Sequence, residues 1–198
     1  MKKLTSILLV LALALTAATA FAATPSKTTA DTSRVVSVEP SADGFVVFVD
    51  EDAEEVLAEI AQLFEAVNVN NMAPIEYFPE EVQAAVAALL PEGFDLKTLE
   101  LNEFVTLDQS GYKDDMGDVK ALFEFATPYA VGQKLVALMG FYSGEKDVED
   151  KFVAEWVVLQ AEVQEDGLVA VYIPADVMTK MVSSKAVALA MLSEPVEQ

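Results

Sequence analysis

The spacing of hydrophobic positions along the chain changes near residue 96. Before that point, two segments carry an apolar residue every three or four positions, which predicts amphipathic helices. The first begins at Asp52, an N-cap with Glu55 as its capping-box partner, and the second begins at Pro79 and ends at Pro91. The first predicted buried stripe is Val56, Leu57, Ile60, Leu63, Phe64 and Val67. The second is Val82, Ala85, Val86, Leu89 and Leu90.

Short β-rich runs bounded by turn residues make up most of the remaining chain. Residues 35–38 and 45–49 flank Asp43-Gly44, and this arrangement predicts a β-hairpin. Six more runs follow residue 96, separated by turns that include Ser143-Gly144 and Asp166-Gly167. These runs are residues 99–107, 119–127, 134–143, 152–163, 168–173 and 185–193.

Six short strands with frequent turns favour a C-terminal antiparallel β-sandwich, with an Ig-like topology as one option. The Cys…Trp…Cys core of antibody domains is missing, so Trp156 is the expected central aromatic residue. Residues 174–181 predict a short helical turn before the last strand. The predicted protein is therefore α+β, with a hairpin and two-helix subdomain at 35–95 beside a β-sandwich domain at 96–198. The pattern leaves open whether these parts form one domain or two.

The first 22 residues have the composition of a secretory signal peptide. Lys2 and Lys3 precede an apolar stretch at 7–20, and Ala20-Phe21-Ala22 supplies small residues for cleavage. The stretch is shorter than the roughly 20 residues that span a bilayer. We therefore expect cleavage near Ala22, a disordered spacer at 23–34, and a secreted, extracellular or cell-envelope location without membrane insertion.

Charge and missing residue types narrow the candidate functions. The chain carries 33 acidic and 12 basic residues; without Lys2 and Lys3 the balance is 10 minus 33, or −23. Such a charge disfavours nucleic acid and anionic lipid as partners. The sequence contains no cysteine and no histidine, which excludes disulfides and Ser-His or Cys-His catalysis. Since 53% of residues are hydrophobic, burial of apolar surface must stabilise the fold.

Four segments of the chain are similar to a group of secreted proteins. They are residues 73–82, 123–138, 155–159 and 188–195. On these segments the chain resembles uncharacterised secreted proteins of anaerobic bacteria, over most of its predicted mature length. The resemblance implies export and a β-sandwich-like C-terminal region, and it brings no catalytic residue and no assigned activity.

One acidic loop, residues 108–118, concentrates oxygen ligands. Asp114, Asp115 and Asp118 are the candidate calcium ligands, with Asp108 as a further one, because calcium takes six to eight oxygens. The spacing does not match an EF-hand, and a solvated acidic turn is the competing interpretation. No catalytic or cofactor-binding residue is predicted, and calcium is the one cofactor under consideration.

Three functional hypotheses follow. The first is a non-catalytic extracellular or cell-surface module that binds a protein or a polysaccharide. The second is a glycoside hydrolase, for which Glu124 and Glu155 are the carboxylates hardest to dismiss because they lie within β runs. The third is self-assembly through unpaired strand edges at 35–49 or 185–193. The aromatic residues considered for a sugar platform are Tyr77, Phe78, Tyr112, Tyr129 and Tyr142.

Overall fold

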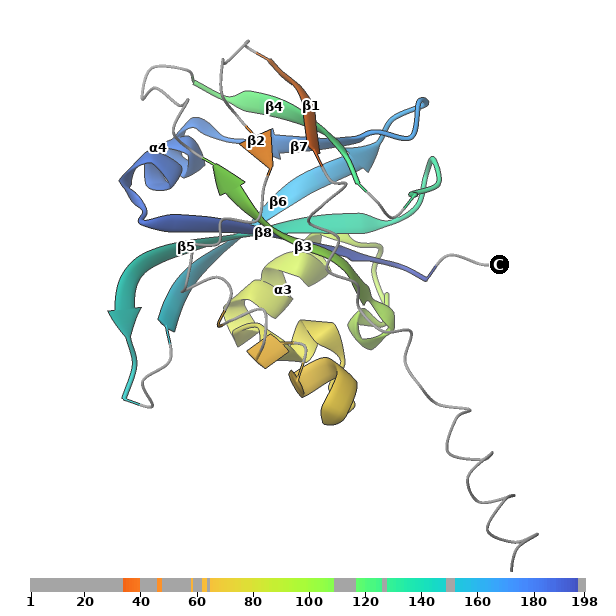
Figure 1. Ribbon diagram of the computed structural model, residues 1–198. Helices are drawn as coiled ribbons and strands as arrows, with labels where there is room; N and C mark the ends of the chain where they lie inside the picture. Colours follow the sequence, from red (N-terminus) through yellow and green to blue (C-terminus); the bar gives the residue numbers. More distant parts are fainter. Residues whose placement is uncertain are drawn as a thin grey trace, which may run out of the picture.

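The computed structural model describes residues 34–39, 46–47, 58, 62–63, 65–108, 117–125, 128–148 and 152–195 (Figure 1). The strands are β1 (Arg34–Glu39), β2 (Val46–Val47), β3 (Glu100–Asp108), β4 (Val119–Glu124), β5 (Leu135–Lys146), β6 (Phe152–Val163), β7 (Val169–Ile173) and β8 (Ala186–Ser193). The helical elements are η1 (Glu65–Val69), η2 (Pro74–Tyr77), α3 (Glu80–Leu89), η3 (Leu96–Thr98) and α4 (Ala175–Ser183).

All eight described strands belong to one sheet, in the order β1-β4-β7-β6-β5-β8-β3-β2, and each pair is antiparallel. The prediction of an antiparallel β-rich fold with a few helices is confirmed. The sandwich and its Ig-like version are not confirmed, because the strands hydrogen-bond in one continuous order. Strand β6 connects the two halves of the sheet: its first part pairs with β5, and its last three residues pair with β7.

The predicted hairpin at residues 35–49 is wrong in its pairing. Strand β1 pairs with β4 and β2 pairs with β3, so the two strands form the opposite edges of the sheet. Only residues 40–45 separate them in the sequence, which places the two edges close together and curls the sheet. The local Asp43-Gly44 signal does not determine which strands pair, because burial of Val38 against β4 and its neighbours is a long-range interaction.

One hydrophobic core lies inside the curl, and we call it the inner core. Strands β1, β4 and β7 contribute buried residues to it from one half of the sheet, and β3, β5 and β8 contribute from the other half. The central members from β5 and β8 are Leu135, Ala137, Met139, Phe141, Val187, Leu189 and Met191. The two halves of the sheet therefore face each other across shared apolar contacts.

A second core, the outer core, lies on the opposite face of β5 and β8, beneath η1, η2 and α3 (Figure 1). The sheet contributes alternate residues, among them Val136, Leu138, Tyr142, Ala186, Ala188, Ala190 and Leu192. The helical layer contributes Leu63, Val67, Ile75, Phe78, Val82, Val86 and Leu90. Every residue of β8 is buried, since its even-numbered positions enter the outer core and Val187, Leu189 and Met191 enter the inner core.

The two predicted helices agree with the structure in part. Strand-facing Val82, Val86 and Leu90 of the second stripe are buried as predicted, but Ala85 and Leu89 are exposed. The reason is geometric: only the line of Val82, Val86 and Leu90 faces the outer core, and Ala85 and Leu89 lie beside this line. From the first stripe, Leu63 and Val67 are buried. Asp52, Glu55, Val56, Leu57, Ile60 and Phe64 lie outside the described residues.

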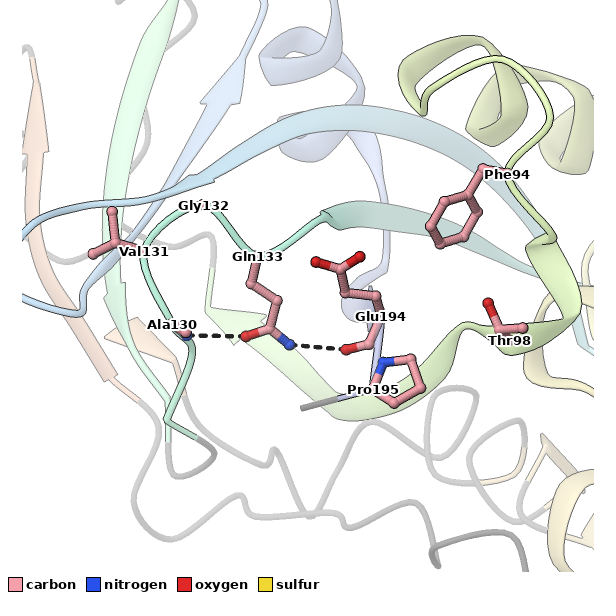
Figure 2. A pocket seen from close by; sticks show the side chains of 8 residues that line it. All are labelled: Phe94, Thr98, Ala130, Val131, Gly132, Gln133, Glu194 and Pro195. Carbon is pink, nitrogen blue, oxygen red and sulfur yellow. Dashed lines mark hydrogen bonds between the residues drawn. The ribbon is translucent and has the colours of Figure 1, made fainter. Parts of the chain in front are cut away.

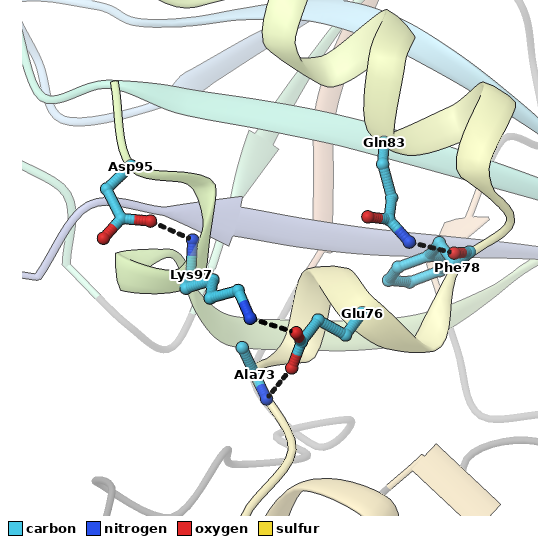
Figure 3. Close-up of polar contacts among 6 residues, drawn as sticks. All are labelled: Ala73, Glu76, Phe78, Gln83, Asp95 and Lys97. Atoms are coloured by element: carbon cyan, nitrogen blue, oxygen red, sulfur yellow. Dashed lines mark hydrogen bonds and ion pairs between the residues drawn. The ribbon is translucent and has the colours of Figure 1, made fainter. Parts of the chain in front are cut away.

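Figure 3 shows the contacts that hold the short helical elements together. The Glu76 carboxylate of η2 accepts hydrogen bonds from Lys97 Nζ of η3 at 2.5 Å and from the Ala73 backbone N–H at 3.3 Å. The hydrogen bond from Lys97 lowers the pKa of Glu76. Beside them, the Gln83 side chain donates to the Phe78 carbonyl at 2.8 Å, which links α3 to η2.

Trp156 is the aromatic centre of the outer core, where it lies across Gly140 of the neighbouring strand. The two residues are opposite each other in the β5–β6 register. The indole makes edge contacts with Phe78, Phe104 and Tyr142, with ring centroids 5.0 to 6.5 Å away. A Cβ atom on Gly140 would lie 2.7 Å from the indole ring, so only glycine leaves room for it.

The turn predicted at Ser143-Gly144 is wrong, because β5 continues through it to Lys146. The register shifts between Tyr142 and Lys146, and Gly144 has a φ of 85°. These features identify a β-bulge, which uses glycine in a left-handed conformation as a turn does. The other hairpin signal, Asp166-Gly167, is confirmed: it joins β6 to β7, and Asp166 accepts from the Leu168 backbone N–H at 3.1 Å.

We predict that Gly140→Ala lowers the free energy of unfolding by about 1–3 kcal/mol through overpacking against Trp156. Urea unfolding followed by far-UV circular dichroism measures the loss. In a Trp156→Phe background, which lacks the clashing ring atoms, the same substitution should cost clearly less. An equal cost in both backgrounds would show that the indole contact is not what requires glycine.

Candidate functional site

Two described hollows lie on either side of one turn, Val131-Gly132-Gln133, and Figure 2 shows the first of them. One has a volume of about 690 Å³ and opens toward Phe94, Thr98, Glu194 and Pro195. The other has a volume of about 550 Å³ and lies between the C-terminal turn of α3 and the last residues of β6. The turn belongs to the connection between β4 and β5, and it forms a ridge between the two hollows.

Gln133 holds this ridge in place. Its Oε1 accepts from the Ala130 backbone N–H at 2.9 Å, which closes the turn (Figure 2). Its Nε2 donates to Ser193 Oγ at 3.1 Å and to the Glu194 carbonyl at 2.9 Å. Because both ends of the amide are engaged with the protein itself, Gln133 acts as a structural clamp between the turn and the end of β8.

The polar groups around the clamp are also paired internally. Ser193, which is fully buried, receives a further hydrogen bond from Asn102 Nδ2. Glu194 Oε1 accepts from the Lys134 backbone N–H at 2.9 Å, and the Glu194 backbone N–H donates to the Lys134 carbonyl at the same distance. This carboxylate is therefore used to fix the strand ends, and no activated nucleophile with an adjacent base occurs among these residues.

Exposed apolar side chains border the hollow next to α3. Val131, on the ridge, is 64% exposed, and Leu89, in the last turn of α3, is 49% exposed. Their position beside a hollow distinguishes them from scattered surface hydrophobic residues, which need no explanation. The site can therefore make apolar contacts through Leu89 and Val131, and polar groups lie at its border.

The calcium prediction is not tested by this structure. Asp114 and Asp115 lie outside the described residues, whereas Asp118 is described and exposed. Its Oδ1 accepts from the Ala175 backbone N–H at 2.9 Å, so Asp118 satisfies a free amide at the start of α4. Within the described part of the chain, no group of three or more acidic residues is arranged to hold a metal ion.

The two carboxylates singled out for glycoside hydrolysis are exposed and lie in separate ion pairs. Glu124 of β4 pairs with Arg34 of β1 at 2.5 Å, and Glu155 of β6 pairs with Lys180 of α4. Neither side chain lines the two hollows described above. Retaining and inverting hydrolysis both need two carboxylates facing each other across a cleft, about 5–10 Å apart. Neither of the two hollows supplies this arrangement from Glu124 and Glu155.

The aromatic side chains proposed for a sugar platform are used mainly for packing. Phe78, Tyr129 and Tyr142 are buried, Tyr77 is partly buried, and Tyr112 lies outside the described residues. No described aromatic residue is among the exposed large hydrophobic side chains. Among the residues whose burial is described, no aromatic ring is fully exposed, and Phe94, which lines the hollow of about 690 Å³, is partly buried.

Two polar side chains, Glu103 and Tyr129, are buried, and the sequence pattern did not single out Glu103. Glu103 is 0% exposed, and it lies opposite Met191 after a shift in the β3–β8 register. The Tyr129 hydroxyl is buried without a hydrogen-bond partner. Burial raises the pKa of the Tyr129 phenol well above its ordinary value, and the charge of Glu103 raises it further. The sequence does contain one indication that Glu103 is buried, because this residue lies within an apolar β run.

The chain matches no protein-family model, no curated protein and no solved structure. Among its described residues, none forms a helix of the length and apolar character that crossing a bilayer demands. Function must therefore be argued from the residues themselves.

We predict that stability falls at alkaline pH through Tyr129. The folded protein holds the phenol proton that the unfolded chain releases near pH 10, so the free energy of unfolding decreases as pH rises above about 10. Tyr129→Phe should reduce this slope and leave stability at neutral pH unchanged or higher, because it removes an unpaired buried hydroxyl. Tyr172→Phe, at a partly buried phenol, is the control. A slope unchanged in Tyr129→Phe would contradict the assignment.

We also predict that Gln133→Leu lowers the free energy of unfolding by about 1–3 kcal/mol, because it leaves the partners of the clamp unpaired. Gln160→Leu is the matched control, since this exposed glutamine lines the hollow on its opposite side. Urea midpoints of the two variants measure the difference. Equal midpoints would refute the role of Gln133 as a clamp.

Proposed function

We propose that this protein is an exported, non-catalytic extracellular or cell-surface module that binds another protein. The observation that carries the proposal is the hollow beside the 131–133 ridge, where Leu89 and Val131 expose apolar surface. Interfaces of this kind have an apolar centre and a polar rim. The rim here includes Gln160 and Glu162 on one side and Lys134 on the other.

A protein partner is better supported than a polysaccharide. Sugar recognition by β-rich modules relies on exposed aromatic faces, and the aromatic residues whose burial is described are all buried or only partly exposed. The hydrolase alternative has less support still, because Glu124 and Glu155 are solvated and separately paired. Self-assembly through residues 185–193 is also disfavoured, since β8 pairs with a neighbour on each side.

The proposal also covers export, which is directed by the N-terminal leader, and the finer architecture of the sheet. The basic and apolar order of residues 1–22 supports export, and the charge of the chain suits a soluble protein. A sandwich-like arrangement is the finer architecture that we propose, in which β4 and β7 of the C-terminal part, with β1 added at their edge, pack over β5-β8-β3. The shared inner core supports it.

The test is retention of the purified mature protein on washed envelopes of the producing organism. We expect the wild type and Val182→Asp to be retained, and Val131→Asp to lose most of its retention. Val182 is a matched control because it is an exposed valine on α4, outside both hollows. Retention that is equal in all three proteins, or absent from the wild type, would contradict a binding role for this hollow.

A parallel assay addresses the hydrolase alternative. Release of reducing sugar from a panel of polysaccharides should not exceed background for the wild type. Release that is abolished by Glu155→Gln would support the hydrolase and overturn the proposal of a non-catalytic module.

A further inference from the structure

Strand β6 has one long side without a neighbour among the described strands. Residues 152–160 pair with β5 on one side, whereas β7 reaches only Ala161, Glu162 and Val163 on the other. Figure 1 shows this part of β5 and β6 diverging from β4 and β7. The side of residues 152–160 that faces away from β5 therefore carries backbone N–H and C=O groups without a described ladder partner. We call this stretch the β6 edge.

The exposure of its side chains shows that the β6 edge is uncovered. Val153 is 48% exposed, and Trp156, Val157 and Val158 are only partly buried. The neighbouring strand β5, which has a partner on each side, is fully buried over residues 135–142. Apolar side chains of β6 therefore lose to solvent the contacts that another strand would give them.

The other edges of the described sheet are protected. Strand β1 carries charge at both ends, through Arg34 and Glu39, and its register shifts between Val35 and Ser37. Charged ends and a bulge are features that prevent an edge from pairing with another chain. Strand β3 has only the two residues of β2 beside it, but its side chains are buried over residues 103–107. The β6 edge has neither kind of protection.

The composition of the β6 edge favours pairing. Between residues 153 and 159 the sequence is Val-Ala-Glu-Trp-Val-Val-Leu, which contains no glycine and no proline. Its single charge, Glu155, is already paired with Lys180 of α4. A β-rich apolar segment with little net charge is the kind that adds a further strand.

A second copy of the same edge fits this position. Two antiparallel copies related by a two-fold axis normal to the sheet keep their equivalent faces on the same side. Ala154, Trp156 and Val158 of one copy would then extend the outer core of the other. Val157 and Leu159 would extend the inner core in the same way. Because each copy supplies what the other lacks, the edge is complementary to itself.

The geometry also selects a register. Opposite residues must point to the same face, so odd positions face odd and even face even. An axis at Trp156 pairs the whole edge, with residue 152 opposite 160, and places Glu155 opposite Val157 rather than opposite its own equivalent. The end of the Trp156 indole lies over Gly140 of β5, away from the edge, which leaves room at the axis.

We propose that the protein forms a two-fold dimer through antiparallel pairing of the β6 edges, centred on Trp156. The dimer is closed, because pairing uses the one β6 edge that each copy has. The sequence pattern pointed to other edges for self-assembly, at 35–49 and 185–193. The proposal goes beyond the binding function, since residues 152–159 line neither hollow.

Net charge gives this dimer a distinctive salt dependence. Each chain carries a formal charge of −21, and two copies repel each other at long range. Salt screens this repulsion and leaves the backbone and apolar contacts of the edge intact. The dimer should therefore become stronger as salt rises from about 0.05 M to about 0.5 M, where the Debye length falls to a few ångströms.

Sedimentation equilibrium of the mature protein is the first test. The wild type should dimerise, and Val153→Glu should weaken the dimer about tenfold or more, because it places a carboxylate opposite Leu159 of the second copy. Val36→Glu is the matched control, since Val36 is a 46% exposed valine on the edge strand β1. This control should dimerise as the wild type does. Circular dichroism verifies that both variants are folded.

Disulfide formation tests the register, in a chain that has no cysteine of its own. In the proposed register Ala154 lies opposite Val158 of the second copy, with Cα atoms about 4.5–5.5 Å apart, which suits a disulfide. An equimolar mixture of Ala154→Cys and Val158→Cys proteins should therefore form a linked dimer on mild oxidation. Either protein alone should link far more slowly, because its two cysteines lie about 14 Å apart along the strands.

Three results would overturn the inference. The first is a wild type that stays monomeric at every salt concentration; if that monomer bound a synthetic peptide of residues 152–160, the edge would belong to an extended segment of another protein. The second is a dimer that Val153→Glu and Val36→Glu weaken equally. The third is self-linking of either single-cysteine protein as fast as the mixture. Dimerisation measured in this way is independent of the envelope assay, so either proposal fails without the other.

Discussion

Burial of the central strands on both faces is the constraint on which the rest of this structure depends. Strand β8 has no exposed residue, and β5 is buried from Leu135 to Tyr142. Apolar side chains must therefore be covered twice, by the curled half of the sheet on one side and by the helices on the other. The sequence of β8 reflects the difference between the two sides: larger residues enter the inner core, and alanines face the outer core at three positions.

The alanines and Gly140 have a shared consequence. Their side chains are small, so the outer face of the central strands has room for Trp156. The indole packs across Gly140 and meets Phe104 from the strand beyond β8. The helices then close over this aromatic layer through Phe78. Two-sided burial ends at Ser193, where the Gln133 clamp pairs the last buried polar groups. The ridge beside the candidate site is thus positioned by the point at which the apolar strands stop.

The sequence predicted most element boundaries because these depend on local signals. The bounds of β6 and β8 and the Asp166-Gly167 hairpin follow from apolar runs and turn residues. Strand pairing could not be predicted in the same way. Two adjacent strands around Asp43-Gly44 form a hairpin by local criteria, yet burial against distant strands places them at opposite edges of the sheet. A glycine signal also cannot distinguish a turn from a bulge, as Gly144 shows.

The candidate site was less accessible to prediction than the fold. Helical periodicity assigns Leu89 to the buried stripe with Val86 and Leu90, because period alone does not say how wide the covering surface is. Val131 lies in a turn and belongs to no periodic pattern. The predicted ligand Asp118 caps α4 across 57 residues of sequence, a partner that loop composition cannot reveal.

Equilibrium unfolding in urea tests the shared-strand account most directly. Trp156 is the single tryptophan of the chain and reports on the outer core, while far-UV circular dichroism reports mainly on the sheet. If β5 and β8 belong to both cores, neither core can unfold alone, and the two signals should follow one transition with the same midpoint. A fluorescence transition at clearly lower urea, with the sheet still intact, would contradict it.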